Sequence, residues 1–217
     1  MSASKCVSSP ASTSNNVLFW IGWFGRCAAF LAAAVAILLP CPLSAERFLS
    51  IPEAQKLCFP QAETFEEETI TLNKDQIAII QERTDVKVRK PAVRLWMARR
   101  ATNVLGVVFF DQVIGKHELI DYVVAISPTG KVVQVEIVEY REHYGTKVRD
   151  AEWRAQFKGK AAGDPLKLNG DIYNITGATL SCRHVTEGVK RVLAAFELVL
   201  RPRLSAARVR DNAPTSP

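Results

Sequence analysis

The residues best suited to chemistry form a run of small and hydroxylated side chains just before a long amphipathic pattern: Thr176, Gly177, Ala178, Thr179, Leu180 and Ser181. A helix start offers backbone N–H groups without intrahelical partners and the positive end of the helix dipole. Gly177 can adopt a positive φ, Ala178 adds little bulk, and the hydroxyls can donate to phosphate oxygens. With Ser181 as the helix cap, the run predicts a phosphate-binding turn. A capped helix after a glycine turn, without any ligand, is the alternative.

A long helix is predicted directly after this turn. Six apolar residues recur at helical spacing and so line one face: Val185, Val189, Val192, Leu193, Phe196 and Leu200. Charged residues, among them Glu187 and Lys190, fill the opposite face. Pro202 is predicted to end the helix, and the basic segment 201–217 is predicted to be a disordered tail.

An antiparallel sheet is predicted before the turn. From residue 92 the apolar spacing changes from helical to alternating, and four runs rich in Val, Ile, Phe and Tyr follow one another. Pro128 and Gly130 in "SPTGK" predict a tight turn, and therefore a hairpin between the last two runs. The fold class is thus α+β, with an antiparallel sheet of about four strands, N-terminal helices and one long C-terminal helix.

Two further segments flank the predicted sheet. Residues 46–91 are interpreted as a helical N-terminal adapter, in which Asn73 caps a helix that buries Ile77 and Ile80. Residues 141–170 combine aromatic side chains with four glycines, which predicts a structured loop region that could cover one edge of a site.

The first 45 residues have the pattern of an export signal. They hold Lys5 and Arg26, no acidic residue, and the apolar run "CAAFLAAAVAILL". The segment "PLSA" then places Ala45 before a predicted cleavage site, so residues 1–45 are interpreted as a signal peptide. An uncleaved membrane anchor formed by residues 17–39 is the alternative. Either reading places the protein in the periplasm or elsewhere outside the cytoplasm.

Charge and cysteine content limit the partners. Residues 1–45 hold two of the 28 basic residues and none of the 22 acids, so the remainder has a net charge of +4 without a long basic run. Nucleic acid is therefore not an expected partner. Of the five cysteines only Cys58 and Cys182 lie beyond residue 45; these two could form a disulfide or remain as two buried thiols.

The turn resembles the [ST]-G-A-T-x-[ST] signature of FMN-binding domains, found in the C subunit of the sodium-pumping NADH:quinone oxidoreductase and the G subunit of the Rnf electron-transport complex. The order of the flanking elements is similar too: the hairpin "VVAISPTGKVVQVEIVEY" and "EWRAQFKGK" come before the signature, and "VTEGVKRVLAAF" after it. The resemblance covers about residues 105–198. Residues 92–200 are therefore interpreted as an FMN-binding domain.

The resemblance implies FMN joined by a phosphoester bond to Thr179, attached by a flavin transferase. Neighbouring signature residues, from Thr176 to Ser181, would bind the cofactor. The family often has an aspartate where this chain has Tyr173, and the nearest acid is Asp171. The glycine-rich "ETPGLG" of the complex subunits is replaced by "EYREHYG", residues 139–145, which favours the simpler exported FMN-binding proteins.

The implied function is that of an exported electron-transfer flavoprotein, because the flavin itself exchanges electrons while the protein sets its position and potential. The chain would relay electrons between a donor and an acceptor that the sequence does not identify. Membrane-bound proteins are among the candidates for both. An electron carrier is favoured over a stand-alone oxidoreductase, and no catalytic side chain is proposed. The alternative is a non-redox binding or scaffold module of the same fold that has lost its flavin.

Competing constellations are weak. Cys182 and His184 are two residues apart on a helix and so face different directions, which argues against a nucleophilic pair. No metal-ligand spacing joins the three histidines, and the turn lacks the lysine of a P-loop. Trp153, Tyr144 and Phe157 are candidates to stack on a flavin ring, with packing in the core as the alternative.

Overall fold

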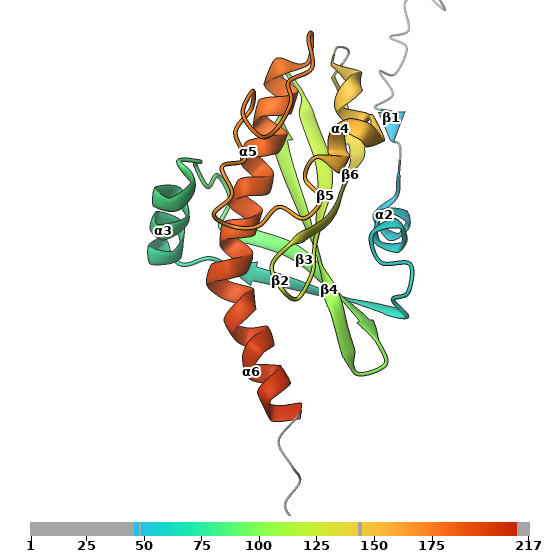
Figure 1. Cartoon of the computed structure of the whole chain (residues 1–217), viewed down its shortest axis with the longest axis vertical. Helices are drawn as coiled ribbons and strands as arrows, with labels where there is room; N and C mark the ends of the chain where they lie inside the picture. The colour runs from blue at the N-terminus through green and yellow to red at the C-terminus, as the bar shows by residue number, and fades with distance from the viewer. Residues whose placement is uncertain (1–45, 48, 143–144, 212–217) are drawn as a thin grey trace, which may run out of the picture. The chain divides into compact units, whose positions relative to one another are not determined.

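One antiparallel sheet organises the computed structural model, which describes residues 46–47, 49–142 and 145–211 (Figure 1). Its strands are β1 (Glu46–Arg47), β2 (Thr64–Thr71), β3 (Ala92–Arg100), β4 (Asn103–Ile114), β5 (Leu119–Ile126) and β6 (Val132–Tyr140). The order across the sheet is β1-β6-β5-β4-β3-β2. The α+β class and the antiparallel sheet are confirmed. The expected four strands are β3 to β6, and β2 and the two-residue β1 extend the sheet at its two edges.

The predicted hairpin is present. Strands β5 and β6 pair antiparallel, with Val124 opposite Val135, and the connecting turn places Gly130 at a φ of 86°. That conformation is easily accessible to glycine alone, which explains why the turn forms at this point.

The central strands are apolar on both faces because helices cover both sides of the sheet. On β4 and β5, Phe109 and Tyr122 belong to a core cluster on one face, whereas Val108 and Val123 belong to a cluster on the other. Successive side chains of a strand point to opposite faces. The unbroken apolar runs of the sequence are therefore explained by a sheet whose two faces are both buried.

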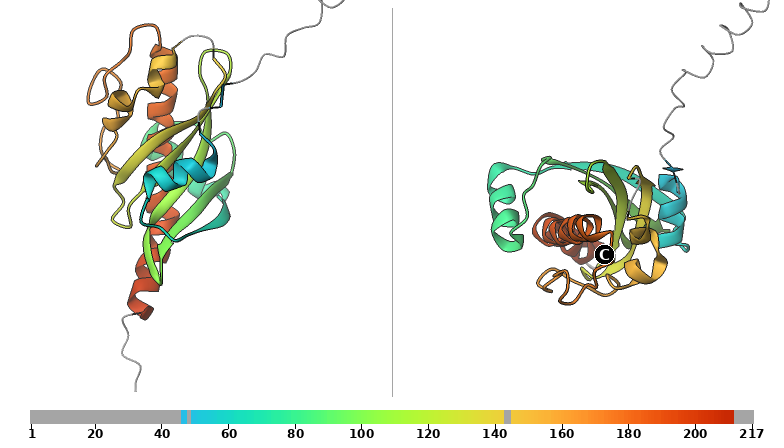
Figure 2. Two further views of the ribbon diagram at one scale, coloured as in Figure 1. Left: turned by 90° about the vertical axis from the view of Figure 1, so that its right-hand side faces the viewer. Right: turned by 90° about the horizontal axis from the view of Figure 1, so that it is seen from above.

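The long helix α5 (Thr179–Ala195) lies along the first of these faces, and the short helix α2 (Ile51–Cys58) covers the other (Figure 2). All six residues of the predicted apolar face belong to the α5-side cluster: Val185, Val189, Val192, Leu193, Phe196 and Leu200. Burial of this face stabilises the helix far more than its intrinsic propensity does.

The segment 46–91 is not purely helical, which corrects the prediction of a helical adapter. It contains α2 and α3 (Lys74–Thr84), and Asn73 caps α3 as expected, with Ile80 fully buried. Between the two helices, however, β2 pairs with β3 along its whole length. Its glutamates form ion pairs with arginines of β3, including Glu67 with Arg94 at 2.6 Å. The segment therefore contributes a strand to the same sheet, and its described residues belong to one compact unit with the rest of that sheet.

The prediction of a disordered tail from residue 201 is wrong over its first part. A π-helical turn, Phe196–Leu200, follows α5, and α6 (Arg201–Asp211) continues from it. Pro202 lies directly after this π-helical turn and does not end the helix, so the prediction that it would do so is wrong. An ion pair of 2.7 Å between Arg203 and Glu68 ties α6 to β2.

The predicted signal peptide or anchor, residues 1–45, and the last six residues lie outside the described part of the chain. Across the ranges that are described, no helix combines the length and the apolar character that crossing a bilayer requires.

Candidate functional site

The signature turn lies at the N-terminal end of α5, but the helix begins three residues earlier than the sequence predicts. Ala178 is the N-cap, and the N–H of Cys182 donates to the Ala178 carbonyl at 2.9 Å. Thr179 is therefore the first helical residue, and Ser181 lies within the first turn instead of capping it. Gly177 precedes the cap at a φ of 85°, so it provides the left-handed step that this turn requires.

The turn presents its hydroxyls unequally. Thr176 and Gly177 are exposed and Thr179 is half-buried, whereas Ala178 and Ser181 are buried. The Ser181 hydroxyl lies 3.2 Å from the Tyr140 hydroxyl, beneath the helix start. The structure thus brings Thr176 and Thr179 to the surface and turns the side chain of Ser181 into the core.

Electrostatics at the turn favour an anion. The N–H groups of the first helical turn have no intrahelical partner and carry the positive end of the helix dipole. All residues in the first turn of α5 are described, and none of them is acidic. A Cβ built on Gly177 would meet nothing within 4 Å, so the space beside the turn is open. The charge at this position therefore suits a phosphate, and no neighbouring atom crowds the turn at Gly177.

Asn174 is a site residue that the sequence reasoning missed. Its side-chain amide donates to Thr179 Oγ1 at 3.1 Å, across the turn. Its Oδ1 is buried and has no hydrogen-bond partner among the described residues. Buried polar atoms are nearly always paired, so an orphan oxygen beside Thr179 marks a place where polar contacts are incomplete.

The loop before the signature is fixed by the "EWRAQF" segment, which contains α4 (Ala151–Ala155). Trp153 Nε1 donates to the Tyr173 carbonyl at 2.8 Å, and the Tyr173 N–H donates to Gln156 Oε1 at 2.6 Å. Trp153 and Phe157 are both buried and pack edge to face, with centroids 5.2 Å apart. These two aromatic residues therefore belong to the core, as the packing alternative predicted, and the third candidate, Tyr144, lies outside the described residues.

Tyr173, which stands where the similar domains often have an aspartate, and Asp171, the nearest acid, differ in exposure. The Tyr173 side chain is 76% exposed. Asp171 instead forms an ion pair with Lys160 at 2.8 Å and accepts the N–H of Lys167 at 2.7 Å. Burial would raise the pKa of Asp171, but these contacts outweigh it and hold the pKa below the ordinary value. Asp171 therefore stabilises its own loop and does not extend toward the signature.

The β4–β5 connection lies against the other side of the helix start. The Glu142 carboxylate accepts the N–H of His117 at 2.5 Å and that of Glu118 at 3.0 Å. Burial would raise the pKa of Glu142, but the backbone N–H donors outweigh it and lower the pKa. His184 Nδ1 lies 3.1 Å from the Gly115 carbonyl, which can only accept, so this nitrogen carries the proton. His184 and Glu142 together fix this loop beside α5.

Neither cysteine adds chemistry to the site. Cys58 and Cys182 are free and buried, and they belong to core clusters on opposite faces of the sheet. Burial raises the pKa of Cys58 to about 12, and it also raises that of Cys182. Within the described ranges, no group of three or more His, Cys, Asp or Glu residues gathers as a metal site.

Comparison with known proteins shows which family this part of the chain is similar to. Residues 115–194, which run from the β4–β5 connection through α5, match the family model of the FMN-binding domain. This segment is thus similar to the FMN-binding domain family. The matched segment contains the whole signature turn, Asn174 and the Trp153 anchor.

Two relatives illustrate the family. The G subunit of the proton-translocating ferredoxin:NAD(+) oxidoreductase complex of Clostridium ljungdahlii is 31% identical over 106 residues, which are 45% of this chain and 57% of that protein. The chain therefore matches little more than half the length of this relative. The crystal structure of Shewanella oneidensis NqrC superposes with a TM-score of 0.45 at 20% identity, covering 73% of this chain and 78% of that one.

Proposed function

We propose that the protein is an exported electron-transfer flavoprotein that carries FMN in phosphoester linkage to Thr179. The observation that carries the proposal is the position of Thr179 as the first residue of α5, with its hydroxyl hydrogen-bonded to Asn174 and open space beside Gly177. The family match supports FMN as the cofactor. The relative's name supports a role in redox chemistry.

Each residue of the turn would have a different role in binding the cofactor. The first-turn N–H groups of Thr179, Leu180 and Ser181 face the position of a phosphate and would stabilise its negative charge. Asn174 would keep the Thr179 oxygen in one orientation. Gly177 and Ala178 would leave the backbone accessible. The exposed hydroxyl of Thr176 would be a second donor.

The flavin supplies the redox chemistry, since it exchanges one or two electrons itself. The chain's part is to fix and expose the cofactor. Leu180 is 39% exposed and Tyr173 is exposed beside the turn, so apolar surface is available to a flat ring. A covalent bond would also prevent loss of the cofactor by dissociation outside the cytoplasm. A flavin transferase would make the bond, and a separate donor and acceptor, membrane-bound proteins among the candidates, would exchange electrons with it.

The test is an intact-mass spectrum of the protein exported by its native host. The wild type is expected to carry the mass of one FMN less one water, and the Thr179→Ala variant to lack it. Thr176→Ala is the matched control, because it removes the other accessible hydroxyl of the same turn. It is expected to keep the added mass. The same spectrum tests export, since cleavage before Glu46 removes the predicted signal peptide.

The other outcomes separate the alternatives. An unmodified but yellow wild type would mean that FMN binds without a covalent bond. An unmodified and colourless wild type would favour the scaffold module. Loss of the added mass in both threonine variants would show that the turn as a whole, and not the Thr179 oxygen, decides attachment.

A further inference from the structure

Asn174 and Thr179 flank a tight turn at the start of α5. The N–H of Ala178 donates to the Ile175 carbonyl at 2.9 Å and closes a four-residue turn. Gly177, at the third position of this turn, has the positive φ that a type II turn requires there. The Asn174 side chain spans the turn, and its Nδ2 donates to Thr179 Oγ1 at 3.1 Å. The residue before the turn therefore holds the residue after it.

The backbone that carries Asn174 is itself fixed. At the preceding residue, Tyr173, the carbonyl accepts a hydrogen bond from Trp153 Nε1 at 2.8 Å. The Tyr173 N–H donates to Gln156 Oε1 at 2.6 Å. A side chain that starts from an anchored backbone loses little further freedom when it makes one more contact. The hydrogen bond to Thr179 is therefore made from a defined position.

This contact is made although part of the amide is left without a partner. Asn174 Oδ1 is buried and has no hydrogen-bond partner among the described residues. An unpaired buried oxygen costs stability, so a side chain that served only to stabilise the loop would be expected to have both ends of its amide paired. The amide is therefore better explained by its effect on Thr179 than by its contribution to the fold.

An amide can bind Thr179 Oγ1 both as a hydroxyl and as an ester. Nδ2 donates to a lone pair of Oγ1, so the contact does not use the hydroxyl proton and can persist after that proton is lost. When the ester forms, Oγ1 bonds to the phosphorus of a phosphoric anhydride of FMN, the anhydride bond breaks, and the departing phosphate takes the proton. A carboxylate at residue 174 could only accept a hydrogen bond, so it would not bind the ester oxygen, and its charge would repel the phosphate.

The other accessible hydroxyl of the turn lacks such a contact. Thr176 is exposed, and its hydroxyl has no hydrogen bond within the part of the chain that the structure describes. A freely rotating hydroxyl must lose that freedom in order to react, whereas Thr179 Oγ1 is already oriented. Asn174 thus distinguishes the two threonines.

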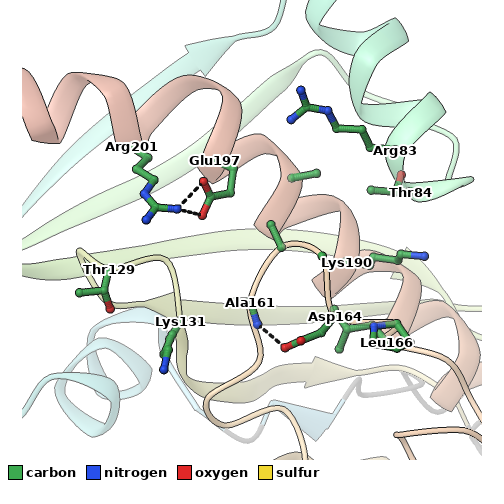
Figure 3. A pocket seen from close by; sticks show the side chains of 14 residues that line it. Arg83, Thr84, Thr129, Lys131, Ala161, Asp164, Leu166, Lys190, Glu197 and Arg201 are labelled. Carbon is green, nitrogen blue, oxygen red and sulfur yellow. Dashed lines mark hydrogen bonds and ion pairs between the residues drawn. The ribbon is translucent and has the colours of Figure 1, made fainter.

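A cavity farther along α5 has no comparable arrangement among its lining residues. Its volume is about 690 Å³, and Arg83, Lys131 and Lys190 are part of its lining. Their charged ends point apart (Figure 3), so these groups do not converge on one atom as Asn174 does on Thr179. The signature turn is therefore the more specific arrangement.

We propose that Asn174 positions the Thr179 oxygen for flavin attachment and keeps its hydrogen bond to that oxygen in the ester. This inference rests on the proposed function. It gives Asn174 a role in the attachment step, separate from the binding of the phosphate by the N–H groups of the helix start.

The rate of flavin attachment in the native host tests this role. Intact-mass spectra taken at intervals after induction give the fraction of the exported chain that carries one FMN less one water. Asn174→Ala is expected to slow attachment about five- to tenfold, the effect of losing one hydrogen bond. Asn174→Asp is expected to be slowed at least as much, because its carboxylate cannot donate and repels the phosphate. Asn103→Asp makes the same change at an exposed position of β4 and is expected to match the wild type.

A double-mutant cycle on the full chain, purified from cells that do not attach flavin, separates positioning from loop folding. Thr179→Val removes Oγ1 and keeps the shape of the side chain. Asn174→Ala should lower Tm less in the Thr179→Val background than in the wild type, because only the wild type has this hydrogen bond to lose. A loop that simply collapsed without Asn174 would show the same loss of Tm in both backgrounds.

The results that would overturn the proposal are distinct from those that concern the proposed function. Equal attachment rates for Asn174→Ala and the wild type would overturn the role of Asn174 and leave Thr179 as the acceptor. Equal losses of Tm in the two backgrounds would do the same, as would a slowing by Asn103→Asp as large as that by Asn174→Asp. A wild type without FMN on Thr179 would overturn the proposed function and this inference together.

Discussion

Gly188 sets how closely α5 approaches the sheet, and replacing it with alanine should destabilise the protein. A Cβ built on Gly188 lies 1.8 Å from the hydroxyl of Tyr122, where ordinary contact begins at 3.4 Å. Tyr122 is fully buried and its hydroxyl donates to Asp111 at 2.5 Å, so it has no room to yield. Either α5 or the tyrosine must therefore move by about 1.6 Å.

Whether Gly188→Ala raises or lowers the free energy of unfolding follows from comparing the gain in helix propensity with the cost of overpacking. Alanine gains about 1 kcal/mol over glycine in helix propensity. Overpacking of a core costs about 1–3 kcal/mol, and disturbing the Tyr122 hydrogen bond adds about 1 kcal/mol. We expect a net loss of about 1–3 kcal/mol, which corresponds to a fall in Tm of roughly 3–10 °C for a domain of this size.

Thermal unfolding followed by circular dichroism measures this effect, and a double-mutant cycle with Tyr122→Phe identifies its cause. Without the tyrosine hydroxyl, Gly188→Ala should cost less. Gly177→Ala is the control, because its Cβ meets nothing and its cost of about 1–2 kcal/mol comes from the positive φ alone. Equal costs of Gly188→Ala in both backgrounds, or a stabilised variant, would refute the proposed contact.

Three further predictions concern individual side chains. Glu142→Gln should lower Tm at neutral pH, because a carboxylate with a lowered folded-state pKa stabilises the fold while it is ionised. The difference in Tm from the wild type should disappear as the pH falls below 4.5 and the carboxylate becomes protonated. Thermal melts at a series of pH values measure this difference. Cys58, with a pKa of about 12, should resist iodoacetamide at pH 8 in the native protein and react after denaturation, as counted by mass. Phe157→Ala should cost about 3–5 kcal/mol in urea unfolding, because the ring is fully buried.

The sequence predicted most of what is decided locally. The hairpin followed from Pro128 and Gly130, and the buried face of α5 followed from helical spacing. The strand β2 was missed because "TFEEETIT" is acidic and has no alternating apolar pattern. It is an edge strand, and the glutamates that argue against burial pair with arginines of β3 once the register is known.

At the candidate site too, features that depend on neighbouring residues could be predicted, whereas contacts between residues distant in the sequence could not. The small residues and the positive φ of Gly177 could be predicted from the turn itself. The role of Ser181 could not, because its hydroxyl contacts that of Tyr140, which is 41 residues away in the sequence. The contact of Asn174 with Thr179 also depends on how the loop folds back, which no spacing rule specifies.

The structure explains how one surface threonine can be held in a defined place. Gly188 fixes the depth of α5 on the sheet, the side chains of Trp153 and Gln156 hold the preceding loop, and Glu142 orders the loop on the other side. Each anchor is buried or half-buried, whereas Thr176 and Gly177 remain exposed. An electron carrier needs this combination, because its cofactor must keep one orientation toward the protein and still be reachable by two partners in turn. A scaffold module would need the anchors but would have no use for the open, acid-free turn.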